Sequence, residues 1–400
     1  MTGYRFKATN AAQAGFDSAI LQELPRYLDA AAMAEEYPGA ALLLARGDTI
    51  VLGHVTGFED VATRAPVRSD SIFTLYSMSK PLTAAGLMAL HEDGKFDLDE
   101  PVSLYLPEFR DFARITGNKA SREPTIRETL THTAGFSFGK TPEEMMAFMA
   151  RVDWSRARSL TELVGLYATT PASYEPGADW EYSVATDLQA EIAERITGER
   201  FDLFLERRLF APLGMTDTGF VLTHEQSRRL VQGHVRDVAT GRLRAATLAE
   251  RRESIFPMGG TSLKSTALDY ARFCRMLLNR GSLGEAQVFK PETVDLMLSN
   301  QLSDDFLETK RGVLHYMVGH GNGHAMNGLV CLDPARAGRP VGKGTYEWGG
   351  AFSTFFWVDP EHDILCVGML NRQRDPLDVR PPELVAQDIV YRALDRSHMA

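Results

Sequence analysis

The chain has 400 residues, 44% of them apolar and 24% charged, with a formal net charge of −10. This length can bury a large core and is compatible with two domains. The acidic balance, without a dense Lys/Arg cluster, argues against a nucleic-acid-binding protein, because such proteins usually carry a basic patch. The N-terminus lacks the apolar core of a signal peptide, and no apolar run reaches about 18 residues. We therefore expect a cytoplasmic protein that does not bind a membrane.

Metal and cofactor sites are not indicated by the sequence. The cysteines number only three and lie far apart, so they form neither a disulfide framework nor a metal knuckle. His315, His320 and His324 lie close in sequence, but no carboxylate accompanies them at ligand spacing. We expect no metal and no cofactor.

The first predicted elements are a helix and a hairpin. Leucine and methionine at helical spacing predict a helix over residues 16–36. Two apolar segments, 39–45 and 49–55, are joined by Arg46-Gly47-Asp48, a hairpin signal. A second helix should follow Ser77.

The middle of the chain, residues 96–304, is dominated by helical signals and loops. Thr125 and Glu128 form a capping box that predicts a helix start. An i, i+4, i+8 apolar stripe beginning at Leu188 predicts a helix that ends at Gly198. Thr266 should cap another helix.

Strand patterns return after about residue 305. Residues 346–358 and 364–369 are rich in aromatic and β-branched side chains, with a turn between them, and 382–396 reads as a final helix. This order predicts an α+β fold, in which an antiparallel sheet is built from both chain ends and flanked by N- and C-terminal helices. We expect residues 1–95 and 305–400 to form this sheet domain and 96–304 an inserted, mainly helical domain, with a site in the cleft between them.

Ser77-Met78-Ser79-Lys80 carries the first chemical signal. Residues i and i+3 share a helix face, so the Lys80 amine can reach the Ser77 hydroxyl. Pro81 is tolerated only near a helix start, so Ser77 should lie at a helix N-terminus, which favours developing negative charge. A serine needs a neighbouring base to become a nucleophile, and a lysine at this spacing can supply one. By itself the pattern favours a surface serine and a solvated lysine, because S-x-x-K arises readily by chance in a chain of this length.

Two later segments strengthen this signal. Tyr182 stands at a turn before a predicted helix and can direct its hydroxyl into a cleft. Trp348-Gly349-Gly350-Ala351 lies inside a predicted strand, where glycines often mark a close approach by another group. If that strand is an edge strand, its N–H groups could bind a substrate oxyanion and its acyl chain.

The order S-x-x-K, Y-S-x and W-G-G, over roughly residues 38–372, resembles the serine β-lactamase and penicillin-binding protein superfamily, in its class C-like branch. The chain is most similar there to the family VIII carboxylesterases. The resemblance implies a β-lactamase-like fold in which Ser77 is the nucleophile that forms an acyl-enzyme. It implies that Lys80 and Tyr182 are a general base/acid pair, with either as the base. It implies an oxyanion hole made by the backbone N–H groups of Ser77 and Ala351.

The implied substrate-binding residues are Trp348, Gly349, Gly350 and Val184. β-Lactamases of the superfamily usually carry K-T-G where this chain has Trp348-Gly349-Gly350, and an asparagine where it has Val184. The lost cation and amide favour a neutral, apolar ester over an antibiotic. The expected activity is therefore a carboxylesterase for short- to medium-chain esters, with a small-molecule ester as its only expected partner and the oligomeric state left open.

Other functions remain open on the same motifs. An acyltransferase, a D-amino-acid amidase or peptidase, or a weak β-lactamase would use the same acyl-enzyme, and a non-catalytic acyl-binding sensor would stop at it. Residues 135–139 also match G-x-S-x-G, but this pattern needs a strand, a turn and a helix. Here it follows a capped helix and precedes a loop, so we expect Ser137 to lie in a glycine-rich loop.

Overall fold

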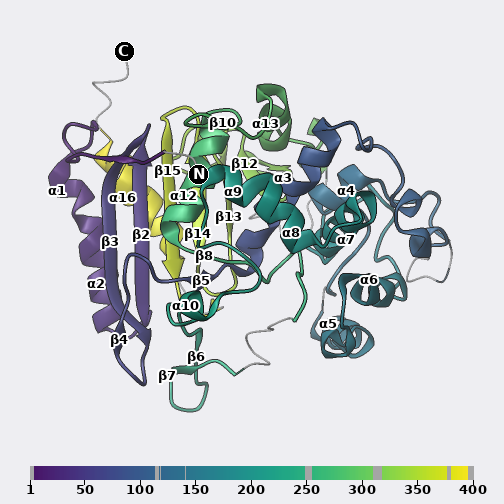
Figure 1. Cartoon of the computed structure of the whole chain (residues 1–400), viewed down its shortest axis with the longest axis horizontal. Helices are drawn as coiled ribbons and strands as arrows, with labels where there is room; N and C mark the ends of the chain where they lie inside the picture. Colours follow the sequence, from purple (N-terminus) through teal and green to yellow (C-terminus); the bar gives the residue numbers. More distant parts are fainter. Residues whose placement is uncertain are drawn as a thin grey trace.

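The computed structural model describes residues 4–112, 117, 119–139, 141–247, 255–309, 318–375 and 380–394. A nine-stranded sheet runs through it in the order β1-β3-β2-β15-β14-β13-β12-β11, with β4 paired to β3 (Figure 1). Every strand pair is antiparallel except β1 with β3. The strands are β1 Lys7–Ala8, β2 Gly39–Arg46, β3 Thr49–Asp60, β4 Ala65–Pro66, β11 Asn322–Ala325, β12 Gly328–Cys331, β13 Tyr346–Gly349, β14 Phe355–Asp359 and β15 Ile364–Leu370.

Both faces of this sheet are buried, and the alternation of side chains along each strand explains how. In β2, Leu42 and Leu44 belong to the core cluster on one face, while Ala41 and Leu43 belong to the cluster on the other. β15 alternates in the same way. A strand that is buried on both faces has apolar residues at consecutive positions. This explains the continuous apolar sequence of residues 39–45.

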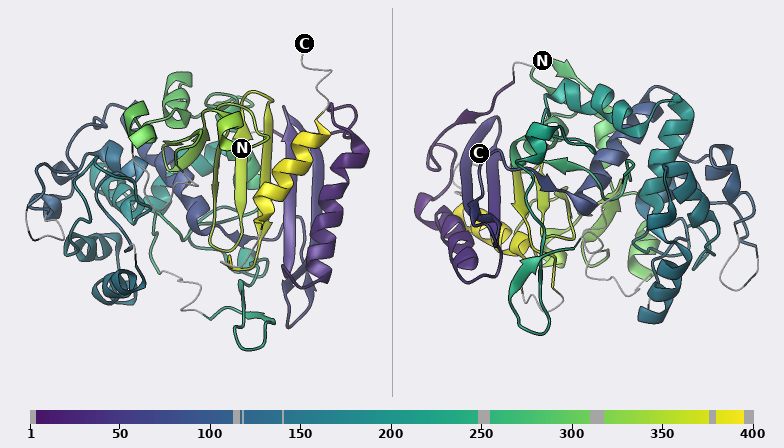
Figure 2. Two further views of the ribbon diagram at one scale, coloured as in Figure 1. Left: turned by 180° about the vertical axis from the view of Figure 1, so that it is seen from behind. Right: turned by 60° about the horizontal axis from the view of Figure 1, so that its bottom comes forward.

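One face is covered by helices from the two chain ends. These are α1 Ser18–Leu21, α2 Glu23–Met33 and α16 Pro382–Ala393. Figure 2 shows α16 (yellow) beside the purple N-terminal helices on that face. The predicted single helix over 16–36 is two helices, because the chain turns at Gln22 between α1 and α2.

The opposite face packs against α12, which contacts β14 and β15, and α4 to α8 gather beyond the β12 end of the sheet (Figure 1). The helices of this part are α3 Ser79–Glu92, α4 Ile126–Thr131, α5 Pro142–Arg151, α6 Leu160–Ala168, α7 Ala185–Thr197, α8 Phe201–Leu205, α9 Ala211–Leu213, α10 His224–Ser227, α12 Ala267–Leu278, α13 Pro291–Leu298, α14 Asp304–Thr309 and α15 Pro334–Ala337. Short strand pairs connect them: β5 Phe73–Thr74 with β8 Lys264–Ser265, β6 His234–Arg236 with β7 Leu243–Ala245, and β9 Ser282–Leu283 with β10 Ala286–Gln287. The predicted α+β architecture is confirmed, while the predicted domain limits remain a prediction.

Local signals placed most element boundaries correctly. The Thr125/Glu128 capping box opens α4, and Gly198 ends α7 in a left-handed conformation. Thr266 caps α12. The predicted end of the last helix, at 396, lies outside the described residues.

The region 346–358 was predicted wrongly as one strand. It forms β13 and β14, separated by the turn Gly350–Thr354, so Gly350 and Ala351 lie just beyond a strand end. As a whole β13 is not an edge strand, because Tyr346 and Glu347 pair with β12 and all four of its residues pair with β14. The register with β12 stops at Glu347, so Trp348 and Gly349 pair with β14 alone. Within the described ranges, none of the helices is both long and apolar enough to cross a bilayer.

Candidate active site

Ser77 lies in a single 3₁₀ turn, Tyr76–Met78, that leads directly into α3. Its hydroxyl is therefore close to the N-terminus of a 14-residue helix, where the dipole favours negative charge. Tyr76 has φ of 49°, a conformation that costs energy in a residue with a side chain. Its ring stacks on Phe352, with centroids 4.4 Å apart, which holds the turn in this shape.

Lys80 occupies the first turn of α3, three residues after Ser77, and only 5% of it is exposed. Its Nζ donates to the carbonyl oxygen of Gly260 at 2.8 Å and to Ser77 Oγ at 3.4 Å. The amine is thus fixed between a backbone acceptor and the serine oxygen.

Tyr182 approaches from the loop before α7, and its hydroxyl oxygen lies 2.5 Å from Ser77 Oγ. The Lys80 ammonium nitrogen lies 4.8 Å from the centroid of the Tyr182 ring. The predicted trio of Ser77, Lys80 and Tyr182 is therefore brought together, and the tyrosine oxygen is nearer the serine than the lysine is. This geometry suits passage of a proton between Ser77 Oγ and Tyr182.

Asp187 adds a buried carboxyl behind Lys80 that the sequence analysis missed. It accepts from Gly260 N at 2.9 Å and from the Tyr167 hydroxyl at 2.9 Å. Burial raises its pKa, and the nearby Lys80 charge acts in the opposite direction. Gly260 thus joins the two groups, since its carbonyl binds Lys80 and its amide binds Asp187.

Gly350 brings the turn after β13 against the serine turn. A Cβ at this position would lie under 3.0 Å from the Leu75 carbonyl oxygen and from Thr354 Oγ1. Thr354 Oγ1 also donates to the Leu75 carbonyl at 3.2 Å. Only glycine lets the two turns lie this close together. Their close contact places Ala351 at the wall of a cavity that Ser77 also lines.

This cavity has a volume of about 810 Å³ and extends from Ser77 and Tyr182 to α16. Its wall includes the predicted substrate-binding residues Trp348, Gly349 and Gly350. Val184 is not among the lining residues; it is buried at the start of α7.

Trp348 belongs to a buried cluster of rings, with His132 and His324, that packs around Tyr182. The Trp348 and Tyr182 ring centroids are 5.7 Å apart, and those of Trp348 and His324 are 5.9 Å apart. His132 lies 5.0 Å from the Tyr182 ring and 5.5 Å from that of His324. Burial lowers the pKa of His324 to about 3 and that of His132 well below its usual value, so both imidazoles are neutral near pH 7. No sequence motif pointed to this histidine pair.

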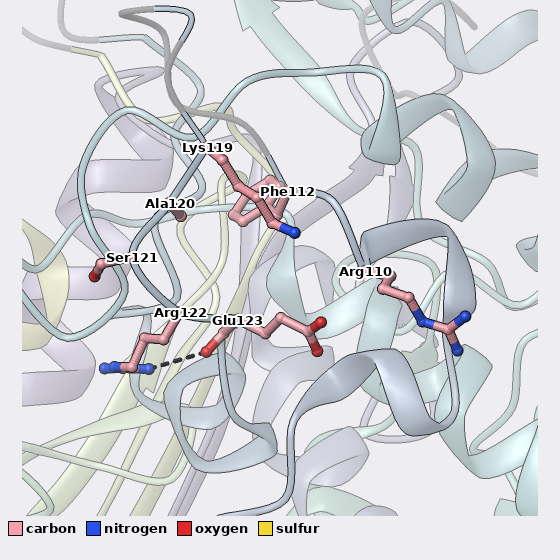
Figure 3. Close-up of a pocket in the computed structure, with 7 residues that line it drawn as sticks. All are labelled: Arg110, Phe112, Lys119, Ala120, Ser121, Arg122 and Glu123. Atoms are coloured by element: carbon pink, nitrogen blue, oxygen red, sulfur yellow. Dashed lines mark hydrogen bonds between the residues drawn. The ribbon is translucent and has the colours of Figure 1, made fainter.

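Other candidate features lie elsewhere. The small hollow in Figure 3, about 210 Å³ and lined by residues 110, 112 and 119–123, contains none of the predicted site residues. Ser137 lies in the loop after α4, where its Oγ accepts from Gly139 N at 2.9 Å. Of the three histidines weighed as metal ligands, His315 falls outside the described residues. No cluster of three or more potential metal-binding side chains occurs in the part of the chain that the structure describes.

Known proteins resemble this chain over nearly its whole length. Esterase EstB of Burkholderia gladioli is 29% identical over 397 residues, covering 94% of this chain and 96% of its own. Among solved structures, EstCE1, a hydrolase with promiscuous acyltransferase activity, matches with a TM-score of 0.78 and 24% identity, covering 93% of this chain and 99% of its own. Simvastatin synthase LovD of Aspergillus terreus matches with a TM-score of 0.77 and 23% identity over 93% and 98% of the two chains. The model of the Beta-lactamase family matches residues 24–389, so the chain belongs to the beta-lactamase family and is a β-lactamase-like member with esterase relatives.

Proposed function

We propose that this protein is a family VIII-type carboxylesterase that cleaves short- to medium-chain esters through an acyl-enzyme on Ser77. One observation carries the proposal: Ser77 Oγ lies 2.5 Å from the Tyr182 hydroxyl and 3.4 Å from Lys80 Nζ at the wall of a large cavity. A serine hydroxyl within reach of a base, at the wall of a cavity that can hold the substrate, is the arrangement that nucleophilic acyl transfer requires.

In the proposed cycle, the Lys80/Tyr182 pair takes the proton of Ser77 as Oγ attacks the ester carbonyl carbon. The negative charge that develops on the carbonyl oxygen is bound by the backbone N–H groups of Ser77 and Ala351. The pair then gives the proton to the departing alcohol oxygen as its bond to carbon breaks. Water repeats the sequence on the acyl-enzyme, which releases the acid and restores the Ser77 hydroxyl. Lys80 and Tyr182 act as one coupled unit in both halves.

The cavity wall supports the proposed substrate class. Trp348 presents an indole where a lysine would attract a substrate carboxylate, and Phe356 and Leu329 add further apolar surface. A cavity of about 810 Å³ accommodates an acyl chain of several carbons. Neutral esters should therefore bind better than anionic β-lactams. The esterase EstB, similar over nearly the full length of both chains, supports this choice.

Acyl transfer is the second candidate. The cavity continues past Ser77 to α16, which leaves space for an alcohol to enter beside the acyl group. EstCE1, which has the same fold, is described as having promiscuous acyltransferase activity alongside hydrolysis. Whether water or an alcohol enters second decides between the two activities.

The test is a panel of p-nitrophenyl esters of increasing chain length, assayed beside a chromogenic cephalosporin. Release of p-nitrophenol should continue well past one equivalent per enzyme, with little cephalosporin turnover. Release that stops at one equivalent would contradict hydrolysis and favour an acyl-binding protein. Added alcohols would raise the p-nitrophenol rate and form new esters if acyl transfer competes.

A further inference from the structure

Hydrogen bonds fix the turn that carries Ala351 on several sides. Gly350 N donates to the Thr354 carbonyl at 2.7 Å, and Ser353 N donates back to the Gly350 carbonyl at 3.1 Å. The backbone N–H of Arg374 donates to the Ala351 carbonyl at 2.8 Å. The segment after β15 therefore supports the turn that the proposed oxyanion hole uses.

The Arg374 side chain makes a further contact with this turn. Its Nε donates to the Gly350 carbonyl oxygen at 3.1 Å, and its Nη1 donates to Glu383 Oε1, on α16, at 2.7 Å. A Cβ on Gly349 would lie 2.8 Å from Arg374 Nη2. The missing side chain of Gly349 thus makes room for the guanidinium over the end of β13.

We propose that Arg374, held by Glu383, is a positioning residue that orients the Gly350–Ala351 peptide for oxyanion binding. The inference rests on the proposed function. In a trans peptide the C=O and the following N–H point in opposite directions. A guanidinium bonded to the Gly350 oxygen therefore directs the Ala351 N–H away from itself. The positive charge also polarises the peptide, which strengthens its N–H as a donor.

An ordinary ion pair at the cavity rim would not have this effect. The Arg374 and Glu383 side chains are 35% and 23% exposed, and partly exposed pairs contribute little to stability. If Arg374 and Glu383 formed only a surface ion pair, removing it should leave kcat unchanged. Loss of the Gly350 contact should instead lower kcat while KM stays nearly constant, because the oxyanion forms only in the transition state.

The test compares Arg374→Met, Arg374→Lys and Glu383→Gln with Arg392→Met. Arg392 is a matched control because it also pairs with acids near α16, Glu23 at 2.5 Å and Asp388 at 3.3 Å, and does not line the cavity. We expect kcat of Arg374→Met to fall about 10- to 100-fold, less than the 10²- to 10³-fold loss of a direct oxyanion donor. Arg374→Lys, which keeps a charge and a donor, should recover part of this loss, and Arg392→Met should match the wild type.

A second readout is the infrared carbonyl stretch of the acyl group on Ser77. Oxyanion-hole hydrogen bonds weaken the C=O bond, so Arg374→Met should move this band to higher frequency. Gly349→Ala alone should lower kcat, because its methyl would meet the Arg374 guanidinium. When Arg374 is already methionine, the same change should affect kcat much less, because the guanidinium is gone.

Arg374→Met with unchanged kcat and an unchanged carbonyl band would overturn the inference, as would a loss confined to KM. A wild type that forms no acyl group on Ser77 would instead overturn the proposed function, so the two failures are distinguishable.

Discussion

Replacing Gly350 with alanine should impair catalysis more than stability. The new methyl would lie under 3.0 Å from the Leu75 carbonyl, whereas ordinary contact begins at 3.4 Å. The Ser77 turn and the Ala351 turn must then separate by about half an ångström or more. Because a misplacement of about 1 Å can cost 10²-fold in rate, we expect kcat/KM to fall about 10- to 100-fold. The overpacking itself should cost about 1–3 kcal/mol of the free energy of unfolding.

The assay is kcat/KM for p-nitrophenyl butyrate, expressed per active site titrated with a phosphonate, beside urea unfolding. Gly53→Ala is the matched control, because Gly53 lies in β3 and a Cβ there would meet nothing within 4 Å. That variant should keep both activity and stability. A Gly350→Ala enzyme that is as active per site as Gly53→Ala would refute the close-approach argument.

Three further variants test separate parts of the account. Ser137→Ala should keep most of kcat, because its hydroxyl accepts from Gly139 N in a loop; a loss as large as that of Ser77→Ala in a folded protein would contradict this. Trp348→Lys should shift the kcat/KM ratio of cephalosporin to ester toward the anionic substrate by about 1–2 kcal/mol, and an unchanged ratio would count against the specificity argument. Burial lowers the pKa of His324 from 6.5 to about 3, so the unfolded chain binds more protons than the folded one between these values. Linkage to this group therefore lowers the free energy of unfolding as the pH falls from about 6.5 toward 3, with a slope that approaches about 1.4 kcal/mol per pH unit below pH ~5.5. His324→Gln should reduce the slope of the unfolding free energy against pH by about that amount between pH ~4 and ~5.5, and an equal slope would show that burial does not lower the pKa of His324.

Much of the fold was predictable because its signals are local. The caps at Thr125 and Thr266 use residues three apart, and the hairpin of 39–45 with 49–55 closes through the two residues Gly47 and Asp48. The Ser77/Lys80 spacing is likewise a property of one helix turn. These patterns need no knowledge of the rest of the chain.

The rest depends on contacts between distant segments. The turn at Gly350 could not be predicted from the aromatic sequence 346–358. It is set by packing against Leu75 and by hydrogen bonds from the segment after β15. Tyr182 could be linked to Ser77 only through the family resemblance. The His132/His324 pair and the Arg374–Glu383 pair join residues from different elements and carry no sequence motif.

The central claim is that Ser77 becomes acylated, and mass spectrometry of the digested acyl-enzyme tests it most directly. The enzyme is mixed with a p-nitrophenyl ester, quenched in acid within the first turnovers, and digested to locate the added acyl mass. We expect the acyl mass on the peptide that contains Ser77, accumulation of the same adduct when deacylation is slowed, and no adduct in Ser77→Ala. An adduct on Ser137, or continued turnover by Ser77→Ala, would contradict it.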